Sequence, residues 1–354
     1  MTPAILDDIP DGLLEKPAPA LYQQLDGPTL IHLAGRDPRP LFVSVLQHGN
    51  EDAGWEAVRR LLRSRYRQDP LPRSLSLLVG NVAAARYRRR RLDEQPDFNR
   101  CWPGGAHGDN EIGHLFRQIT EHMRERQPFA SIDIHNNTGL NPHYAAITRI
   151  QEHTLRLTAQ FCSTVVFFTS PTGVQTSAFN EFCPALTLEC GQAGVIHGTD
   201  HAMTFLEYCL RLRNIGDAVL EPSDLRLFHT VATVYVAPGI EFGFLPERKP
   251  LSFIANLDHL NFTELPAGTL LGRHQGDHRA CLRALDESGN DMTEATFDFS
   301  NGEIRTRMAL MPSMLTPDER VIRQDCLCYL MTRVDPEHPK IRAAGEPTLP
   351  EPQE

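Results

Sequence analysis

The stretch LFVSVLQHGNEDAGWEAVRRLL, residues 41–62, is the part of the sequence that decides the fold. Residues 41–46 are rich in Leu, Phe and Val, which predicts a short buried strand. Residues 52–62 repeat their apolar side chains at helical spacing, which predicts a helix. His48 and Glu51 lie between the two, at a strand-to-helix turn. Because α/β proteins place their functional groups at such turns, this stretch predicts an α/β fold with a site there.

A second apolar strand is predicted at residues 131–135, SIDIH, and it ends in His135. Two strand ends can converge on one ion, and a set of His48, Glu51 and His135 suits zinc. Three protein ligands leave a fourth position for water, as in catalytic rather than structural zinc sites. Asp133 shares a strand face with His135, so its carboxylate could orient the imidazole. The alternative is a buried Asp bonded to backbone.

Chance pairs must be separated from this site, because the chain contains 15 histidines. His122 and Glu125 have the same spacing as His48 and Glu51. They lie in a polar, amphipathic helical segment, where residues three apart are neighbours on a solvated face. We therefore expect them at the surface. The His48 pair differs because a strand ends beside it and Gly49 permits a tight turn.

A catalytic zinc site also needs a proton carrier, and Glu189 is the candidate. It ends a third short apolar strand at residues 185–189. An unpaired Glu is costly to bury, so it either turns to solvent or has a function beside the metal. Such a carboxylate can take a proton from a zinc-activated water and deliver it to a leaving amine. Cys190 points to the opposite strand face and is assigned to the core.

Four motifs occur in order along the chain: HGNE at 48–51, DFNR at 97–100, DIHNNTG at 133–139 and ECG at 189–191. With these motifs, residues 40–215 resemble the succinylglutamate desuccinylase/aspartoacylase family, which is related to the zinc carboxypeptidases. The resemblance implies one Zn²⁺ per chain, with His48, Glu51 and His135 as ligands. It further implies that Glu189 is the general base and then the general acid.

The resemblance also implies a set of substrate-binding residues, namely Asn99, Arg100 and one arginine further upstream. Arg91 is the best match for the upstream arginine. Because the segment before Asp97 is about one residue longer than expected, Arg90 or Arg88 could serve instead. Independently of the family, the planar guanidinium of Arg100 can grip a carboxylate through two hydrogen bonds.

These features predict a zinc-dependent hydrolase that cleaves the amide bond of a small N-acyl amino acid carrying a carboxylate. Two alternatives stay open. One is a metallocarboxypeptidase or other peptide-trimming enzyme with the same zinc site. The other is a non-catalytic zinc protein that binds acylated metabolites.

The order of predicted elements indicates an α/β fold with a mixed, mostly parallel sheet flanked by helices, like that of zinc carboxypeptidases. Short strands and turns then predict a smaller β-rich domain. The expected divisions are an N-terminal arm at 1–27, a catalytic domain at 28–220, the β-rich domain at 221–334 and a flexible tail at 335–354. In the family, the β-rich domain narrows access to the site, which would favour small substrates.

Composition limits the partners. The 354 residues are 41% hydrophobic, and the formal charge is −10, which gives no reason to expect nucleic acid or a membrane surface as a partner. We see neither a long apolar run nor a signal peptide, so cytoplasm is expected. Eight scattered cysteines predict reduced thiols. A homo-oligomer stays open.

Overall fold

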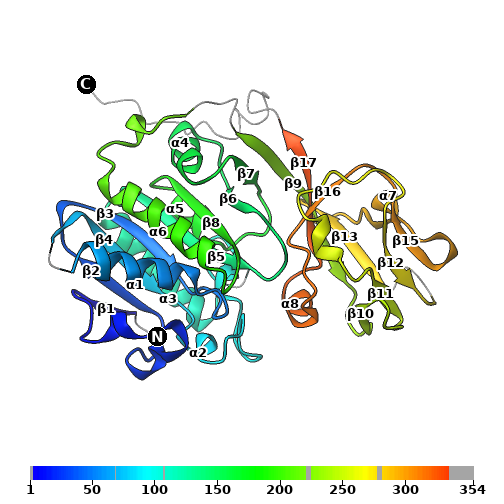
Figure 1. Ribbon diagram of the computed structural model, residues 1–354, viewed down its shortest axis with the longest axis horizontal. Coiled ribbons are helices and arrows are strands. Elements are labelled where there is room, and N and C mark those ends of the chain that lie inside the picture. Colours follow the sequence, from blue (N-terminus) through cyan, green and yellow to red (C-terminus); the bar gives the residue numbers. More distant parts are fainter. Residues whose placement is uncertain (1–2, 68, 107, 221–224, 277–280, 335–354) are drawn as a thin grey trace.

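A large mixed β-sheet is the main structural element of the molecule (Figure 1). The computed structural model describes residues 3–67, 69–106, 108–220, 225–276 and 281–334. Within these ranges the sheet has twelve strands, in the order β1-β2-β4-β3-β5-β8-β6-β7-β9-β17-β16, with β13 paired to β9. In chain order, the strands are β1 (Ala4–Leu6), β2 (Thr29–Leu33), β3 (Gly35–Val45), β4 (Leu71–Val79), β5 (Ala130–Asn137), β6 (His143–Ile147), β7 (Thr164–Phe167), β8 (Ala185–Gln192), β9 (Arg226–Val236), β13 (Leu282–Asp286), β16 (Met311–Ser313) and β17 (Cys328–Val334).

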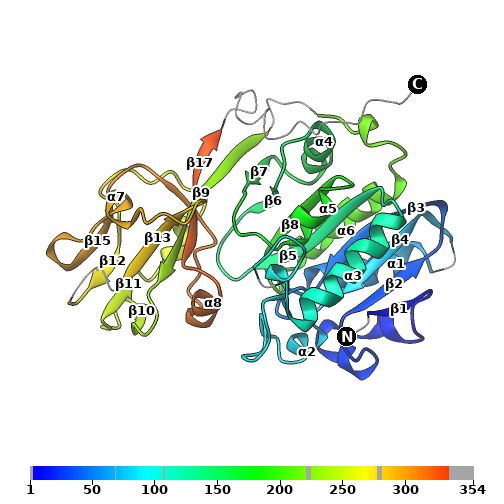
Figure 2. The ribbon, with the colours of Figure 1, turned by 180° about the vertical axis from the view of Figure 1, so that it is seen from behind.

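Helices cover both faces of the first part of this sheet. In Figure 1, α1 (Ala53–Arg65) and α6 (Ile196–Arg211) lie in front of the sheet, and in Figure 2, α3 (Glu111–Glu125) lies in front. Residues 40–45 of β3 are buried on both sides because their side chains alternate between two apolar clusters. Val43 belongs to the cluster under α1 and α6, and Phe42 to the one under α3. The smaller helices are α2 (Val82–Ala85), α4 (Glu152–Phe161) and α5 (Gln175–Phe179).

The predicted α/β architecture is confirmed. Strand β3 runs parallel to both β4 and β5, and β5 runs parallel to β8, so their carboxyl ends lie at one edge. The helix predicted at residues 52–62 spans 53–65. In the segment expected to be an N-terminal arm, residues 4–6 form β1, the edge strand of the sheet, which pairs with β2. None of the helices within the described ranges combines the length and the apolar composition needed to span a bilayer.

The β-rich region is continuous with the main sheet through β9. Residues 226–229 of β9 pair with β7, and residues 232–236 pair with β13. The region also contains a second sheet, seen at the right of Figure 1, with the order β10-β11-β12-β15-β14. Its strands are β10 (Phe242–Phe244), β11 (Leu251–Phe253), β12 (Leu270–His274), β14 (Phe297–Asp298) and β15 (Glu303–Thr306). The predicted tail, residues 335–354, lies outside the described residues.

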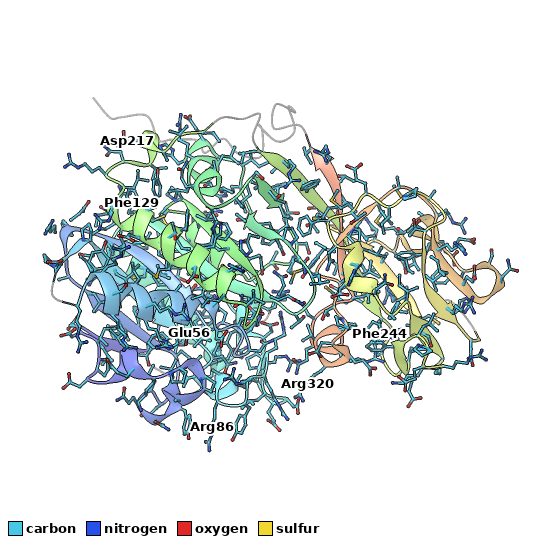
Figure 3. The ribbon with its side chains drawn as sticks, viewed as in Figure 1. Glu56, Arg86, Phe129, Asp217, Phe244 and Arg320 are labelled. Atoms are coloured by element: carbon cyan, nitrogen blue, oxygen red, sulfur yellow. The ribbon has the colours of Figure 1, made fainter. Side chains whose placement is uncertain are left out.

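Two short helices accompany the β-rich region, α7 (Thr293–Thr296) and α8 (Glu319–Gln324). Arg320 on α8 lies where this region meets the catalytic domain (Figure 3). Its guanidinium forms an ion pair with Asp93 of the catalytic domain. Asp325, directly after α8, also contacts Arg100 of the DFNR segment.

The helical position of His122 predicted a side chain free on the surface. The structure differs from this prediction. His122 is half-buried, and its Nε2 lies 3.0 Å from Nε2 of His32 on β2. His32 also bonds Ser76 through Nδ1. Burial, helped by Arg126 and His122, lowers the pKa of His32 to about 4. Two imidazoles that face one another in this way are stable only while at least one is neutral.

This histidine pair predicts a loss of stability in mild acid. In the unfolded chain His32 takes up a proton near pH 6.5, whereas in the folded protein it resists protonation down to about pH 4. Unfolding therefore binds a proton in this window, and stability falls as the pH falls through it. We expect the Tm of the wild type to drop from pH 7.5 to pH 5.0 by more than that of His32→Gln. Equal drops would contradict the assignment.

Candidate metal centre and substrate cavity

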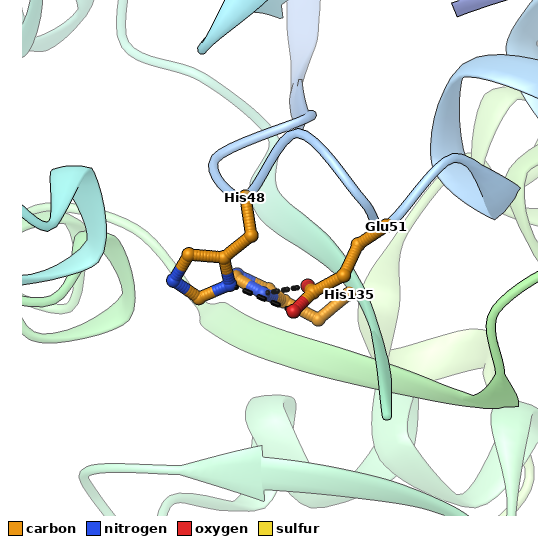
Figure 4. Close-up of side chains that lie close together, drawn as sticks. All are labelled: His48, Glu51 and His135. Atoms are coloured by element: carbon orange, nitrogen blue, oxygen red, sulfur yellow. Dashed lines mark hydrogen bonds and ion pairs between the residues drawn. The ribbon is translucent and has the colours of Figure 1, made fainter. Parts of the chain in front are cut away.

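Three buried side chains bring their ligand atoms together at the carboxyl ends of β3 and β5. They are His48, Glu51 and His135, and their ligand atoms lie within 4.8 Å of one another. Figure 4 shows the Glu51 carboxylate between the two imidazoles. Its Oε1 lies 2.9 Å from Nδ1 of His48, and its Oε2 lies 2.7 Å from Nδ1 of His135. The structure thus unites the predicted ligand set.

Each imidazole is also held from its far side by a carboxylate. Nε2 of His48 lies 3.1 Å from Oδ1 of Asp97, and Nε2 of His135 lies 2.9 Å from Oδ2 of Asp133. The predicted contact between Asp133 and His135 is therefore confirmed. Hydrogen bonds of this kind fix the tautomer that leaves Nδ1 free to bind a metal and make the imidazole a better ligand.

The two carboxylates are themselves anchored. Asp133 accepts hydrogen bonds from Ser44 Oγ at 2.6 Å and from Gln47 Nε2 at 3.3 Å. Asp97 accepts from the backbone N–H of Asn99 and from the guanidinium of Arg90. Buried groups with this many partners have little freedom to reorient, so the geometry around the cluster is preorganised.

The buried imidazoles and carboxylates of the cluster stabilise one another's charged forms. Burial alone would lower the pKa of His135, but the carboxylates of Asp133 and Glu51 outweigh it and hold the pKa well above its usual value. Burial alone would raise the pKa of Glu51, but His48 and His135 outweigh it and lower the pKa. An ionised carboxylate together with two imidazole nitrogens forms a set of three ligands that Zn²⁺ binds in proteins. The residues present therefore fit this metal.

The turn that carries His48 has an unusual backbone. Leu46, directly after β3, has a φ of 57°, a left-handed conformation that a leucine rarely adopts. Asn136 then ties the turn to β5, because its Oδ1 accepts from the N–H of Ala53 while its own N–H donates to Glu51 Oε2. The first turn of α1 and the end of β5 are thereby held in a fixed relation.

Gly49 is needed for a close approach of two backbones. A Cβ at this position would lie 2.2 Å from the backbone N of Ala85 and 2.4 Å from the carbonyl carbon of Ala84, both in α2. Since backbone atoms cannot rotate away, we expect Gly49→Ala to cost about 2–4 kcal/mol of stability and to weaken metal binding. The measurement is denaturant unfolding beside Gly27→Ala, where nothing lies within 4 Å. Equal stability of the two variants would contradict this reading.

Glu189 lies directly beside the metal cluster. In the pairing of β5 with β8, it stands opposite His135, and its side chain lines the same cavity as His48 and Glu51. Asn137 Nδ2 donates to its Oε2 at 3.0 Å. Burial raises the pKa of Glu189 to about 8, with His135 opposing and Glu51 supporting the rise. A carboxyl group that gains and loses a proton near neutral pH is suited to general acid–base work. Cys190 is fully buried in the core.

The DFNR segment places Asn99 and Arg100 in the same cavity. Both belong to a single 3₁₀ turn, Phe98–Arg100. Asn99 Oδ1 is buried and accepts no hydrogen bond from the described residues. It is therefore an available acceptor for an N–H group of a ligand.

Of the upstream arginines, Arg90 is the one that lines the cavity. Its guanidinium lies 3.7 Å from Glu51 and 3.0 Å from Asp97. Arg91 does not line this cavity, because its NH1 donates to the backbone carbonyl of Gln95 at 2.9 Å. It lines a neighbouring hollow instead. Arg88 is exposed. Trp102 is fully buried and packs on Phe116 rather than forming a cavity wall.

The β-rich region contributes residues that sequence reasoning missed. Asp325, at the end of α8, lies between the two arginines, 3.1 Å from NH2 of Arg90 and 3.0 Å from NH2 of Arg100. Tyr329 on β17 accepts a hydrogen bond from Arg100 at 3.2 Å. Met314 lies against Tyr144 on the cavity wall. No motif or spacing marks these residues, since only the fold brings them to the site.

The cavity lined by these groups is formed jointly by the segment that carries the four motifs and by the β-rich region. The candidate metal ligands, Glu189 and the two arginines all line it. A concave site with a few charged groups among apolar side chains is typical of sites for small molecules.

The chain is similar to a known protein family and to several solved structures. Residues 39–212 match the succinylglutamate desuccinylase/aspartoacylase catalytic domain. No curated protein matches the chain.

Several solved structures share the fold. A succinylglutamate desuccinylase from Chromobacterium violaceum has 18% sequence identity and a TM-score of 0.56, over 85% of this chain and 86% of that one. A succinylglutamate desuccinylase/aspartoacylase from Rhodobacter sphaeroides has 16% identity and a TM-score of 0.57, over 87% and 88%. The ectoine utilization protein of Ruegeria pomeroyi has 16% identity and a TM-score of 0.54, also over 87% and 88%. At these identities the similarity shows the fold, including the β-rich region.

Proposed function

Because the chain belongs to the succinylglutamate desuccinylase/aspartoacylase family, we propose that it hydrolyses the amide bond of a small N-acyl amino acid with the help of one bound Zn²⁺. The observation that supports this most strongly is the buried cluster of His48, Glu51 and His135 with Glu189 beside it in one cavity. A metal site without a neighbouring acid–base group would suit binding alone.

Zn²⁺ held by His48, Glu51 and His135 would supply a Lewis acid that polarises the amide carbonyl and lowers the pKa of water. Glu189 takes the proton of the attacking water and later delivers it to the departing amine. Asn137 orients the Glu189 carboxyl group through its 3.0 Å hydrogen bond. Burial keeps bulk water away from this proton transfer, so the proton passes between defined atoms.

The substrate is positioned by the other end of the site. The Arg100 guanidinium grips a carboxylate of the substrate, with Arg90 beside it, and Asn99 Oδ1 accepts the amide N–H. We use Arg90 rather than Arg91 here because Arg90 lines the cavity. Holding the amide between these groups and the metal cluster brings the carbonyl and the water into reacting distance.

The walls of the cavity bear on the choice between this function and peptide trimming. Met314, Asp325 and Tyr329 of the β-rich region line the cavity, and we infer that they restrict access for an extended peptide. The test is release of free amine from zinc-loaded protein with N-acyl amino acids and with acylated tri- and tetrapeptides. Hydrolysis confined to the small substrates supports the proposal. Faster trimming of the peptides would support a carboxypeptidase, and no hydrolysis of either would support a binding protein.

A further inference from the structure

The substrate cavity has two chemically different ends. At one end lie the metal cluster, Asn99, Arg90 and Arg100. Further along the lining, the larger side chains are mostly apolar, and these are Tyr144, Ala146, Val166, Phe168, Val174 and Met314. The polar groups among them are small hydroxyl side chains such as Thr230, Ser170 and Ser313, and none is charged. A ligand that fills the cavity must therefore present a polar group to the first end and a different group to the second.

The apolar wall follows from strand register. Tyr144 on β6 pairs with Glu189, and Ala146 pairs with both Thr187 on β8 and Val166 on β7. Alternate residues of a strand share a face, so Thr187 and Glu189 face the same side as Tyr144, Ala146, Val166 and Phe168. Across the sheet, the lining therefore changes from the catalytic carboxyl group on β8 to aliphatic and aromatic side chains on β6 and β7. This order places the apolar wall beyond Glu189, away from the metal ligands.

The capacity of the site for negative charge is small. Among the described residues that line the cavity, the arginines are Arg90 and Arg100, and no lysine accompanies them. Both guanidinium groups already contact the Asp325 carboxylate, and Arg90 also contacts Asp97. With Glu51, which lies 3.7 Å from Arg90, the two cations thus face three internal carboxylates. One substrate carboxylate can share the remaining donors, whereas a second would have no cation to meet it.

A second carboxylate would instead face the apolar wall. An ionised group placed there loses its water and meets hydroxyl groups at most, with no lysine or arginine of the described lining to balance its charge, which is unfavourable. An alkyl or aromatic group in the same place loses only contact with water and gains packing against Val166 and Phe168. The wall therefore selects against dicarboxylates and for apolar groups of similar size.

We propose that the substrates are N-acyl amino acids with a single carboxylate, held at Arg100, and an uncharged apolar group that packs against Val166 and Phe168. This inference rests on the proposed deacylase function. The apolar group is either the acyl chain or the amino acid side chain, and the same wall would recognise both.

Matched pairs of substrates test the inference on the wild-type, zinc-loaded protein. N-acetylnorvaline is compared with N-acetylaspartate, and N-pentanoylglycine with N-succinylglycine. We expect the apolar member of at least one pair to have a kcat/KM at least about 100-fold higher than its charged partner. The pair with the larger ratio identifies whether the side chain or the acyl chain meets the wall.

Variants of Phe168 then place the discrimination in the cavity. Phe168→Arg adds a cation to the apolar wall, so it should lower kcat/KM for the preferred apolar substrate and raise it for the dicarboxylate. Phe168→Leu keeps the wall apolar and should keep the preference. Phe168 is only partly buried. Val166→Thr, which replaces one methyl group with a hydroxyl, is a milder change and should also lower kcat/KM for apolar substrates.

The outcomes separate the two proposals. If charged and apolar partners are hydrolysed equally well, and Glu189→Gln still abolishes both activities, the deacylase function holds and the inference on substrate class is overturned. If no member of either pair is hydrolysed, the proposed function itself fails. An unchanged preference in a folded Phe168→Arg would show that another surface selects the substrate.

Discussion

Glu189→Gln is expected to reduce kcat for amide hydrolysis by about 10³-fold while zinc stays bound. The glutamine amide has nearly the same shape as the carboxyl group but cannot accept the proton of water or return it to the amine. The proposed metal ligands His48, Glu51 and His135 are untouched, so metal content should remain at one ion per chain. Steady-state kinetics and metal analysis of the same preparation measure both quantities.

The matched control for this variant is Glu121→Gln, which makes the same chemical change on the exposed face of α3. Its kcat should equal that of the wild type. Glu189→Gln with near wild-type turnover would remove Glu189 from the mechanism. Loss of zinc in that variant would instead make Glu189 a metal ligand and require a different proton carrier.

His135→Ala is expected to abolish stoichiometric zinc binding, and with it the activity. Loss of a residue that only hydrogen-bonds a metal ligand lowers zinc affinity by about 10- to 100-fold. Removing a ligand itself should lower zinc affinity by more than this. The change also leaves Asp133 and Glu51, both buried, without the imidazole that they now share. We therefore expect lower stability, so folding is checked by far-ultraviolet circular dichroism before zinc is measured.

His153→Ala, on the exposed side of α4, is the corresponding control and should keep both zinc and activity. A folded His135→Ala protein that retains one tightly bound zinc would mean that the third ligand is another residue. His135→Gln keeps a polar group beside Asp133 and should likewise lose zinc. It therefore separates loss of the ligand from loss of packing.

The cluster of His48, Glu51 and His135, the candidate metal site, could be predicted from sequence because its residues lie at strand ends. His48 follows β3, His135 lies near the end of β5 and Glu189 lies on β8, and these three strands are parallel neighbours. Buried strands show as short apolar runs, and the carboxyl ends of adjacent parallel strands meet at one edge. The motif order then identified the family. Local sequence patterns are sufficient to predict where a side chain lies wherever regular secondary structure positions it.

The substrate end of the cavity could be predicted only in part. Arg90 and Arg91 occupy an irregular segment without a period of two or 3.6, so neither strand nor helix geometry indicates which side chain points inward. Asp325 meets Arg100 across 225 positions of sequence, through a β-rich region whose first strand, β9, pairs on both sides. Such contacts depend on tertiary packing, which leaves no local signal.

Titration of zinc into metal-free protein, followed by amine release from an N-acyl amino acid, tests the central claim most directly. The account predicts no activity without metal, a linear rise as zinc is added, and a plateau at one zinc per chain. Full activity in the metal-free protein, or a zinc-loaded and folded protein that hydrolyses no acyl amino acid, would contradict it.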